Sequence, residues 1–408
     1  MGNIIKLFEN KKDCCGCSAC RNVCPQKAIF MKEDGFGFLY PEIDSRKCIE
    51  CGLCLKVCGY HSPIGEKNKI NAYAMLSKEE KLYNKSASGG AFAVMAQKIL
   101  DDGGYVVGCS MEKEGSGITA KHIIINDKKD LYKLQGCKYV QSDMGQTYYS
   151  TKKILEKGKC VLFSGTPCQI ASLKKYLNKE YNNLITIDLV CHGVPSQKMF
   201  RDYLNELEQK YRINIEKVIF RDKSAGWGLN GFIVGKCDNG KKRKIILNNK
   251  ESSYYYIFQQ GLNYRKSCYS CPFAGELRPG DITIGDYWGI EVEHPELFSD
   301  NNAIWKKGKG ISCIVVHSQK GKEFLEKCEK DMRLYQSTYE KVSRNNSQLL
   351  APTVYDNQWQ EIMNIYCQNG YVGIEKWFKK KMGISLIIIK IRNRIPKRVK
   401  KLLHKIFD

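Results

Sequence analysis

Two copies of one cysteine spacing open the chain and constrain its fold more than any other feature. The copies CCGCSACRNVCP and CIECGLCLKVCG both contain C-x2-C-x2-C-x3-C. Three thiolates in a short loop can bind one 4Fe-4S cubane, whereas the fourth cysteine points toward the other half of the module. The ligand sets are therefore expected to cross over. We predict one cluster on Cys14, Cys17, Cys20 and Cys58, and a second on Cys48, Cys51, Cys54 and Cys24.

This doubled spacing is typical of a bacterial ferredoxin module with two 4Fe-4S clusters. A zinc ribbon is the alternative, but it needs only four sulfurs at one site and leaves half of these cysteines unexplained. The second copy has Gly59 where the motif usually has proline, a residue that shapes the loop and ligates no iron. Cys15 fits no ligand position and is expected to be a packed thiol.

Length and composition indicate a chain of two or three domains. It has 408 residues, 43% of them hydrophobic, which is enough for more than one core. The longest apolar run, at 386–389 with flanking isoleucines, is far short of the roughly 20 residues of a membrane span. The first ten residues lack the apolar core of a signal peptide. We expect a cytoplasmic protein whose cysteines stay reduced in a low-oxygen cell.

The formal net charge of +23 suggests nucleic-acid binding, but the bound clusters would offset part of it, because each carries about two negative charges. Much of the excess is local: residues 377–408 hold eleven Lys or Arg and one acid. This tail alternates isoleucine and leucine with basic residues. A helix on an anionic membrane surface, or on an acidic partner, and a merely solvated tail both remain open.

The pattern along the chain predicts an α+β multidomain protein. A bacterial ferredoxin-like module is followed by an α/β core with β-α-β units and a more antiparallel C-terminal part. We expect strands at 71–77, 105–111, 159–164 and 184–190, separated by helices, and short antiparallel strands after about residue 213. The expected domains are 1–65 (ferredoxin type), 66–150 (first β-α-β unit), 151–345 (third cluster) and 346–408 (basic helical tail).

Four further cysteines are candidates for a third cluster. In FSGTPCQ a strand leads to Thr166 at an N-cap, Pro167 at the first helical position and Cys168 in the first turn, where the helix end stabilises a thiolate. Cys191 ends the next strand, so both sulfurs are expected at the carboxyl edge of a parallel sheet. The alternative is zinc on the CYSCPF pair with two ordinary buried thiols. We predict a third 4Fe-4S cluster on Cys168, Cys191, Cys268 and Cys271.

Glycine-rich segments give weaker signals. Residues 86–90 (SASGG) lie between a strand and a helix, where backbone amides can hold the pyrophosphate of a flavin dinucleotide or simply cap the helix. GWGLNG (226–231) matches G-x-G-x-x-G but leads into a strand, so we interpret it as a turn. His192 beside Cys191 is a candidate proton carrier or a structural group. Asp286 and Trp288 in DITIGDYWG are expected beside the third cluster, without an assigned role.

The motifs SGG, GCKYVQS, GTPCQ, CHGVPS, FRDK, RKSCYSCPF and DITIGDYWG, in this order, resemble the coenzyme F420 hydrogenase/dehydrogenase beta subunit family over about residues 70–330. The resemblance implies an iron-sulfur flavoprotein that binds FAD and a 4Fe-4S cluster and exchanges hydride with coenzyme F420 or another acceptor. It also implies FAD contacts at Ser88, Gly89, Gly90, Gly165 and Thr166. Cys137 departs from the family, which commonly has serine there.

Clusters carry one electron at a time, hydride carriers move two, and a flavin can do both. We therefore expect electrons to pass between a ferredoxin-like or other redox partner protein, the N-terminal clusters, the third cluster, FAD and a small-molecule hydride acceptor or donor. Two alternatives stay open: an electron-transfer subunit of a larger complex without its own substrate, and a zinc-dependent nucleic-acid binder. The sequence assigns no catalytic residue.

Overall fold

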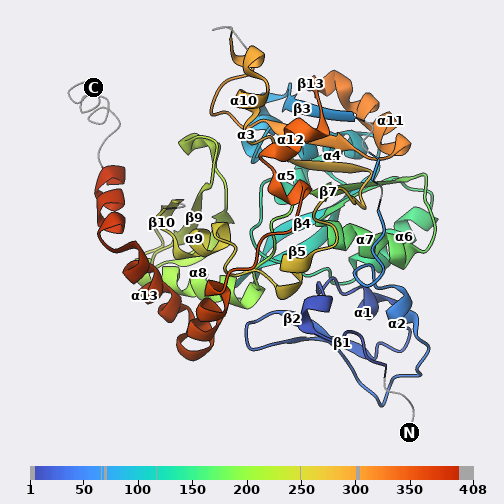
Figure 1. The fold of residues 1–408 in the computed structure, drawn as a ribbon, viewed down its shortest axis with the longest axis horizontal. Coiled ribbons are helices and arrows are strands. Elements are labelled where there is room, and N and C mark those ends of the chain that lie inside the picture. Colours follow the sequence, from blue (N-terminus) through green and yellow to red (C-terminus); the bar gives the residue numbers. More distant parts are fainter. Residues whose placement is uncertain are drawn as a thin grey trace.

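The computed structural model describes residues 5–65, 67–68, 71–115, 117–248, 250–299 and 304–394. Figure 1 shows the N-terminal module below a large sheet with helices on both faces, and a smaller sheet to the side of the large one. The N-terminal module therefore packs against the core and is not joined to it by the linker alone.

The N-terminal module repeats one loop and helix pattern beside a two-stranded antiparallel sheet. Ser18 and Gly52, both left-handed with φ of 64° and 71°, directly precede the short helices that carry the third cysteine of each copy. Such residues reverse the chain direction within a few positions. The elements are η1 (Lys11–Asp13), α1 (Ala19–Val23), β1 (Ile29–Glu33), β2 (Leu39–Ile43) and α2 (Leu53–Lys56).

The core is an eight-stranded mixed sheet in the order β13-β3-β12-β11-β7-β6-β4-β5. The neighbours β4, β6, β7 and β11 run parallel, whereas the outer strands pair antiparallel. The strands are β3 (Asn71–Ser77), β4 (Tyr105–Glu114), β5 (Gly117–Ile125), β6 (Val161–Gly165), β7 (Leu184–Leu189), β11 (Ile282–Asp286), β12 (Ser312–Val316) and β13 (Met332–Ser337). The four predicted core strands are present. The prediction of a parallel sheet is correct only for the four central strands.

The two strands of the first predicted β-α-β unit are not neighbours in the sheet. Strands β3 and β4 belong to one sheet, but β12, β11, β7 and β6 lie between them. Strand β12 folds back antiparallel on β11, with Ser312 opposite Asp286, and β3 then pairs with β12. All five residues of β12 are buried, so this late strand fills the sheet interior.

Helices cover both faces of the sheet. One face packs α4 and α11 around Ile314 and Leu162, and the opposite face packs α6 and α7 around Phe163 and Val161. Strand residues thus alternate between two cores, as expected of a sheet buried on both sides. The helices are α3 (Glu80–Lys85), α4 (Ala91–Asp101), α5 (Leu131–Leu134), α6 (Thr147–Glu156), α7 (Pro167–Leu177), α10 (Ile290–Glu293), α11 (Gln319–Cys328) and α12 (Tyr339–Arg344), with 3-10 turns η2 (Lys128–Asp130), η5 (Pro295–Phe298), η6 (Glu329–Asp331) and η7 (Ser347–Leu349).

A three-stranded antiparallel sheet forms the third part, as predicted for the region after residue 213. GWGLNG forms an irregular turn that leads into its central strand, with positive φ at Gly226 and Gly228. The elements are α8 (Gln197–Tyr211), β8 (Asn214–Ile219), η3 (Lys223–Ala225), β9 (Asn230–Lys236), β10 (Lys242–Asn248), α9 (Ser253–Gln259) and η4 (Lys266–Ser270). Helix α8 and Trp359, from the last helix, share one core with this sheet.

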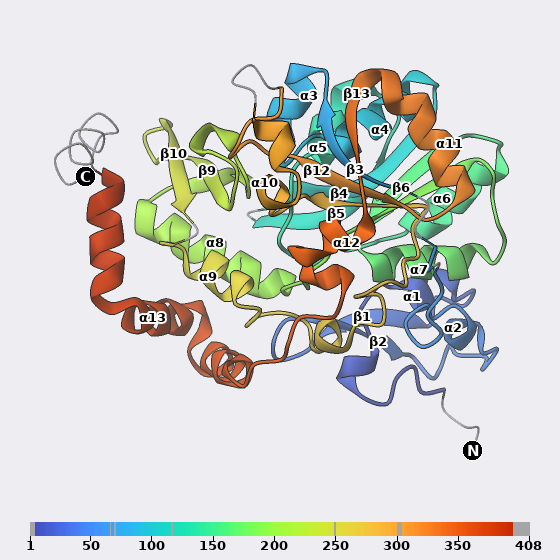
Figure 2. The ribbon, with the colours of Figure 1, turned by 45° about the horizontal axis from the view of Figure 1, so that its top comes forward.

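The chain ends in the long helix α13 (Gln358–Arg394), which breaks at Gly370 and Gly383. Both glycines have positive φ, so the helix changes direction twice (Figure 2). The predicted basic tail is helical as far as residue 394, and its last fourteen residues, 395–408, lie outside the described part. Among the described helices, none has the length and apolar character needed to span a bilayer.

Candidate metal centres

The first cysteine set, Cys14, Cys17, Cys20 and Cys58, lines one pocket, which Cys54 of the second copy also reaches. Burial raises the pKa of Cys20, and the other three thiols of the set raise it further, so all four are in electrostatic contact. The structure therefore brings Cys58 from the second copy to the first three cysteines of the first copy. This is the crossed arrangement that the spacing predicts.

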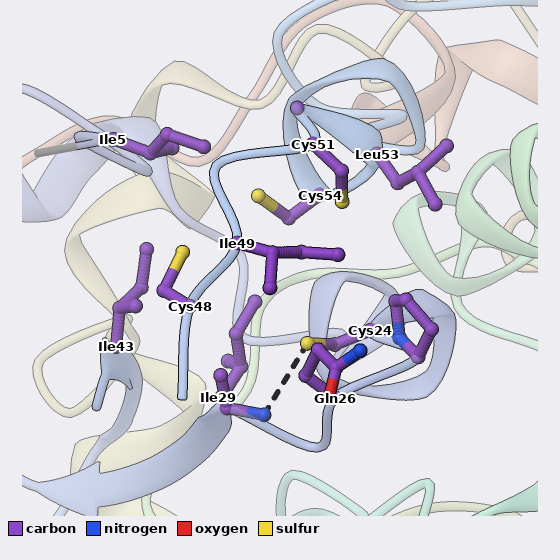
Figure 3. A pocket seen from close by; sticks show the side chains of 13 residues that line it. Ile5, Cys24, Gln26, Ile29, Ile43, Cys48, Ile49, Cys51, Leu53 and Cys54 are labelled. Carbon is purple, nitrogen blue, oxygen red and sulfur yellow. Dashed lines mark hydrogen bonds between the residues drawn. The ribbon is translucent and has the colours of Figure 1, made fainter. Parts of the chain in front are cut away.

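The second cysteine set, Cys24, Cys48, Cys51 and Cys54, lines another pocket. Figure 3 shows these sulfurs among the apolar side chains of Ile29, Ile43 and Ile49. The Ala28 amide donates a hydrogen bond to the Cys24 sulfur at 3.3 Å. Apolar walls and amide donors to sulfur are the features by which proteins adjust a cluster's reduction potential.

The third set, Cys168, Cys191, Cys268 and Cys271, comes from three distant segments. Cys168 lies in the first turn of α7, Cys191 follows β7, and the other two belong to η4 and the residue after it. Burial raises the pKa of Cys191 to about 12, with further contributions from Cys168 and Cys271. Burial likewise raises the pKa of Cys268, and the remaining three thiols add to that shift. The four predicted ligands are thus mutual neighbours at the carboxyl edge of β6 and β7.

The chemistry of these donors fits a cationic cofactor. Buried thiols become thiolates only when a nearby positive charge compensates for the lost water, and iron or zinc supplies that charge. Within the described residues, no three His, Cys, Asp or Glu side chains converge closely enough to hold a single metal ion. A cubane has four irons, so its four cysteines surround a larger volume than those of one ion.

The N-terminus of α7 has the predicted local structure. Thr166 is the N-cap, Pro167 follows it, and Gln169 completes a capping box. The Thr166 amide donates to the Gln169 side-chain oxygen at 2.9 Å. A Cβ at Gly165 would approach the same oxygen at 3.0 Å, so a larger residue here would crowd the capping side chain. The predicted FAD contacts at Gly165 and Thr166 therefore already have structural roles.

Cys15 connects the first and third sets. Its thiol is buried, and hydrogen bonds with Cys168 and Cys17 raise the pKa of Cys15 well above its usual value. The same Cys15 bond lowers the pKa of Cys17 to about 6, although burial opposes this shift. Cys15 is packed, as predicted, but the sequence did not show that it touches a candidate ligand on each side.

Gly59 has a physical reason to replace the usual proline. A Cβ at this position would lie 2.8 Å from the Ala171 carbonyl carbon and from the Ser172 amide nitrogen. The Ser172 hydroxyl, one turn from Cys168, donates to the Cys17 sulfur at 3.0 Å. The ferredoxin module thus approaches the backbone of α7 more closely than a larger residue would allow.

The glycine-rich loop before α4 is held by close packing. The Ser88 hydroxyl donates to the Ile311 carbonyl at 2.7 Å. A Cβ at Gly89 would lie 2.0 Å from the Met75 carbonyl, and Gly90 is the left-handed N-cap of α4 with φ of 98°. These three predicted FAD contacts lie near the N-terminus of an eleven-residue helix. Ser88 and Gly89 also serve the packing of this loop against β3 and β12.

A cationic group lies against this loop. The Lys223 ammonium donates to the Tyr83 carbonyl at 2.6 Å and also to the Ser88 carbonyl, and it lies 3.3 Å from the centre of the Tyr83 ring. Burial, followed by repulsion from Arg221, lowers the pKa of Lys223 to about 7. Only the FRDK motif pointed to this lysine, and the sequence assigned it no role.

Arg221 and Asp286 form a half-buried polar cluster with two tryptophans. Arg221 pairs with both carboxylate oxygens of Asp286, and the Trp227 indole donates to the same carboxylate at 2.6 Å. Trp227 stacks on Trp288, with ring centres 4.4 Å apart and planes inclined by 11°. Arg221 also contacts the Cys137 sulfur at 3.8 Å. Asp286 and Trp288 thus belong to an aromatic and charged group that the sequence did not predict.

The side chain of His192 is exposed. Partial loss of water lowers its pKa, and the Asp286 charge opposes this shift. The histidine directly follows Cys191 of the third set. The described hydrogen bond of this residue is at its backbone, where its carbonyl accepts from the Thr353 hydroxyl at 2.7 Å. A neutral imidazole at this position fits both a proton carrier and a structural group.

Sequence comparison places both halves of this arrangement in known families. Residues 158–342 match the family described as the C terminus of the beta subunit of coenzyme F420 hydrogenase/dehydrogenase, and residues 13–62 match a 4Fe-4S dicluster domain. The resemblance inferred from the motifs is thereby confirmed.

Individual relatives agree with this family. The chain is 26% identical over 329 residues to a coenzyme F420-dependent sulfite reductase of Methanocaldococcus jannaschii, a match that covers 76% of this chain and 45% of the relative. A 45-residue segment is 42% identical to one component of a Na(+)-translocating ferredoxin:NAD(+) oxidoreductase complex of Acetobacterium woodii, over 11% of this chain and 12% of that one. The chain therefore spans less than half of the reductase that it resembles.

Comparison with solved structures gives a match to a chain of the F420-reducing [NiFe] hydrogenase complex from Methanosarcina barkeri. The match has a TM-score of 0.40 and 14% sequence identity, and it covers 79% of this chain and 95% of the matched chain.

Proposed function

We propose that this protein is an iron-sulfur flavoprotein oxidoreductase that passes electrons between three 4Fe-4S clusters and FAD, which exchanges hydride with coenzyme F420 or another small organic substrate. One observation carries the proposal: Cys15 packs in one buried cluster with Cys17 of the ferredoxin module and Cys168 of the core. Bound clusters would supply one-electron transfer, and a bound flavin would join this to two-electron chemistry.

The residues have separate tasks in this proposal. The three cysteine sets hold the clusters, and Cys15 with Ser172 keeps the first and third sets in contact. Lys223 and the N-terminus of α4 offer positive charge to the flavin pyrophosphate. The Trp227–Trp288 stack and the Arg221–Asp286 pair offer an aromatic plane and fixed charges to a planar substrate.

Coenzyme F420 is the first candidate substrate because the relatives are F420-linked proteins by name. The test is steady turnover by the anaerobically purified chain, supplied with reduced ferredoxin and with F420 or alternative acceptors. Continuous reduction of an acceptor supports an enzyme with its own substrate. Flavin and clusters that are reduced once, with no turnover, favour the alternative of an electron-transfer subunit. That alternative is considered because the chain covers only 45% of the reductase relative, whose remainder can carry the substrate site.

The flavin site predicts the effect of removing one buried charge. Replacing Lys223 with methionine is expected to lower the flavin content of the purified protein, because the ammonium beside the Ser88 carbonyl then no longer attracts the pyrophosphate. Flavin is measured by absorbance after acid release. Lys217→Met, at an exposed position of β8, is the matched control and should keep its flavin. Equal flavin in both variants would contradict this placement.

The exposed apolar and basic residues of helix α13 lead us to predict weak binding to anionic membranes. Ile384, Ile387 and Ile388 are 58% to 75% exposed and share one helix face, which follows the exposed Lys379–Lys381 run. We expect the protein to sediment with vesicles that contain anionic lipid, and the I384D/I388D variant to sediment several-fold less. Val354→Asp changes an equally exposed apolar residue outside α13 and serves as the control. Equal sedimentation of all three proteins would favour a solvated tail.

A further inference from the structure

Arg265 is a fully buried arginine between the first and third cysteine sets. Its side chain is 0% exposed. The guanidinium donates to the Cys14 carbonyl at 2.7 Å and to the Leu39 carbonyl at 2.8 Å, both in the ferredoxin module. Its own carbonyl accepts from the Cys268 amide at 2.9 Å, in the third set. Arg265 therefore touches a candidate ligand of each set.

In the part of the chain that the structure describes, Arg265 forms no ion pair with an acidic side chain. Its remaining guanidinium contacts are the Gln141 side-chain oxygen at 3.3 Å and the Cys14 sulfur at 3.8 Å, and the Tyr40 ring centre lies 4.0 Å away. Among the described residues, no carboxylate lies within ion-pair distance of it. The other two deeply buried guanidinium groups each have one, at Asp188 for Arg278 and at Asp286 for Arg221.

A buried cation needs a compensating negative charge, because carbonyl dipoles and an aromatic face recover only part of the lost hydration. The titratable groups that act electrostatically on Arg265 include Cys14, Tyr40, Cys15 and Cys268, and three of these four are cysteines. A 4Fe-4S cluster with four thiolates carries about two negative charges when oxidised. The cluster proposed on the first set would thus supply the charge that the protein itself does not place beside Arg265.

The loop of the ferredoxin module is shaped to this guanidinium. Gly16 is left-handed, with φ of 68°, and a Cβ there would lie 2.8 Å from an Arg265 nitrogen. The side-chain amide of Gln141 donates to the Cys15 carbonyl at 2.9 Å, so Gln141 and Arg265 both hold this loop. Arg265 is therefore held in place by the packing of this loop.

We infer that Arg265 is a positioning residue that balances the charge of the clusters on both sides of it and so raises their reduction potentials. The inference rests on the proposed function and adds a determinant of electron flow to it. Reduction of either cluster by a one-electron donor adds one negative charge beside a cation that stays protonated, so no proton has to move with the electron. Arg265 thereby favours the reduced form on both sides of the contact between the module and the core.

The test compares Arg265→Gln, Arg265→Lys and the control Arg333→Gln with the unaltered protein, all loaded anaerobically. Arg333 is exposed on the edge strand β13. Cluster potentials are measured by redox titration followed by electron paramagnetic resonance (EPR). We expect the glutamine variant to shift at least one cluster to a lower potential, the lysine variant to shift it less because the charge remains, and R333Q to shift nothing.

Several outcomes separate this role from a purely structural one. If R265Q holds the normal amount of iron at unchanged potentials, the inference is wrong while the proposed function stands. If R265Q loses its iron, R265K decides: normal iron and potentials support the charge role, whereas an equal loss shows that the guanidinium shape is needed and contradicts it. An unaltered protein that contains no iron after anaerobic purification would instead overturn the proposed function.

Discussion

Replacing Cys191 with serine is expected to remove the third cluster and leave the other two in place. A cubane needs four thiolate ligands, and Cys191 is the residue that brings β7 into the third set. Iron should fall from about twelve to about eight atoms per chain, and the EPR signal of one reduced cluster should disappear. Electrons supplied to the N-terminal module should then reach the flavin far more slowly.

A control for this experiment is Cys237→Ser, which changes a partly buried cysteine that packs against the core of the smaller sheet and belongs to no set. It should keep the iron, the EPR spectrum and the flavin reduction rate of the unaltered protein. If Cys191→Ser also retains all its iron and all its EPR signals, the third set does not hold a cluster. Zinc on Cys268 and Cys271 would then become the better interpretation.

Replacing Arg278 with glutamine is expected to destabilise the core by about 3 to 5 kcal/mol, the usual effect of removing one partner of a buried ion pair. The side chains of Arg278 and Asp188 are 1% and 0% exposed. Without the guanidinium, the Asp188 carboxylate keeps hydrogen bonds from Thr283 at 2.6 Å and from the Gly280 amide at 2.8 Å but loses its cation. The free energy of unfolding is measured by urea denaturation followed by tryptophan fluorescence.

The same substitution should also loosen the third cysteine set. Arg278 donates to the Phe273 carbonyl at 2.9 Å and to the Leu189 carbonyl at 2.8 Å. These carbonyls lie two residues from Cys271 and Cys191, respectively. Arg46→Gln, whose side chain is 88% exposed in a surface pair with Asp44, is the control and should leave the free energy of unfolding nearly unchanged, because exposed ion pairs add little stability. If Arg278→Gln destabilises the protein no more than Arg46→Gln does, the view that the Arg278–Asp188 pair supports the core is contradicted.

The local features of the fold could be predicted from the sequence because short-range chemistry specifies them. The residues Thr166, Pro167 and Gln169 define a helix start by themselves, and the structure has α7 beginning there. The crossed cysteine sets follow from spacing alone. The position of β3 could not be predicted in this way, because its neighbours β12 and β13 come from residues more than 200 positions later.

The contacts between the module and the core were also beyond sequence reasoning. Arg265 binds the Cys14 carbonyl across 251 residues, and Cys15 meets Cys168 from a distant part of the chain. Periodicity and capping describe neighbours along the chain and contain no information on such pairs. Gly59 did carry a signal, since a departure from proline in an otherwise regular motif indicates a close approach, here to Ala171.

The central claim is that the spaced cysteines hold clusters that connect a flavin with an external electron donor. Its most direct test is the content of iron, acid-labile sulfide and flavin in anaerobically purified protein. The account predicts a brown protein with about twelve irons, about twelve sulfides and one flavin per chain. A colourless protein that contains zinc and neither iron nor flavin would contradict it.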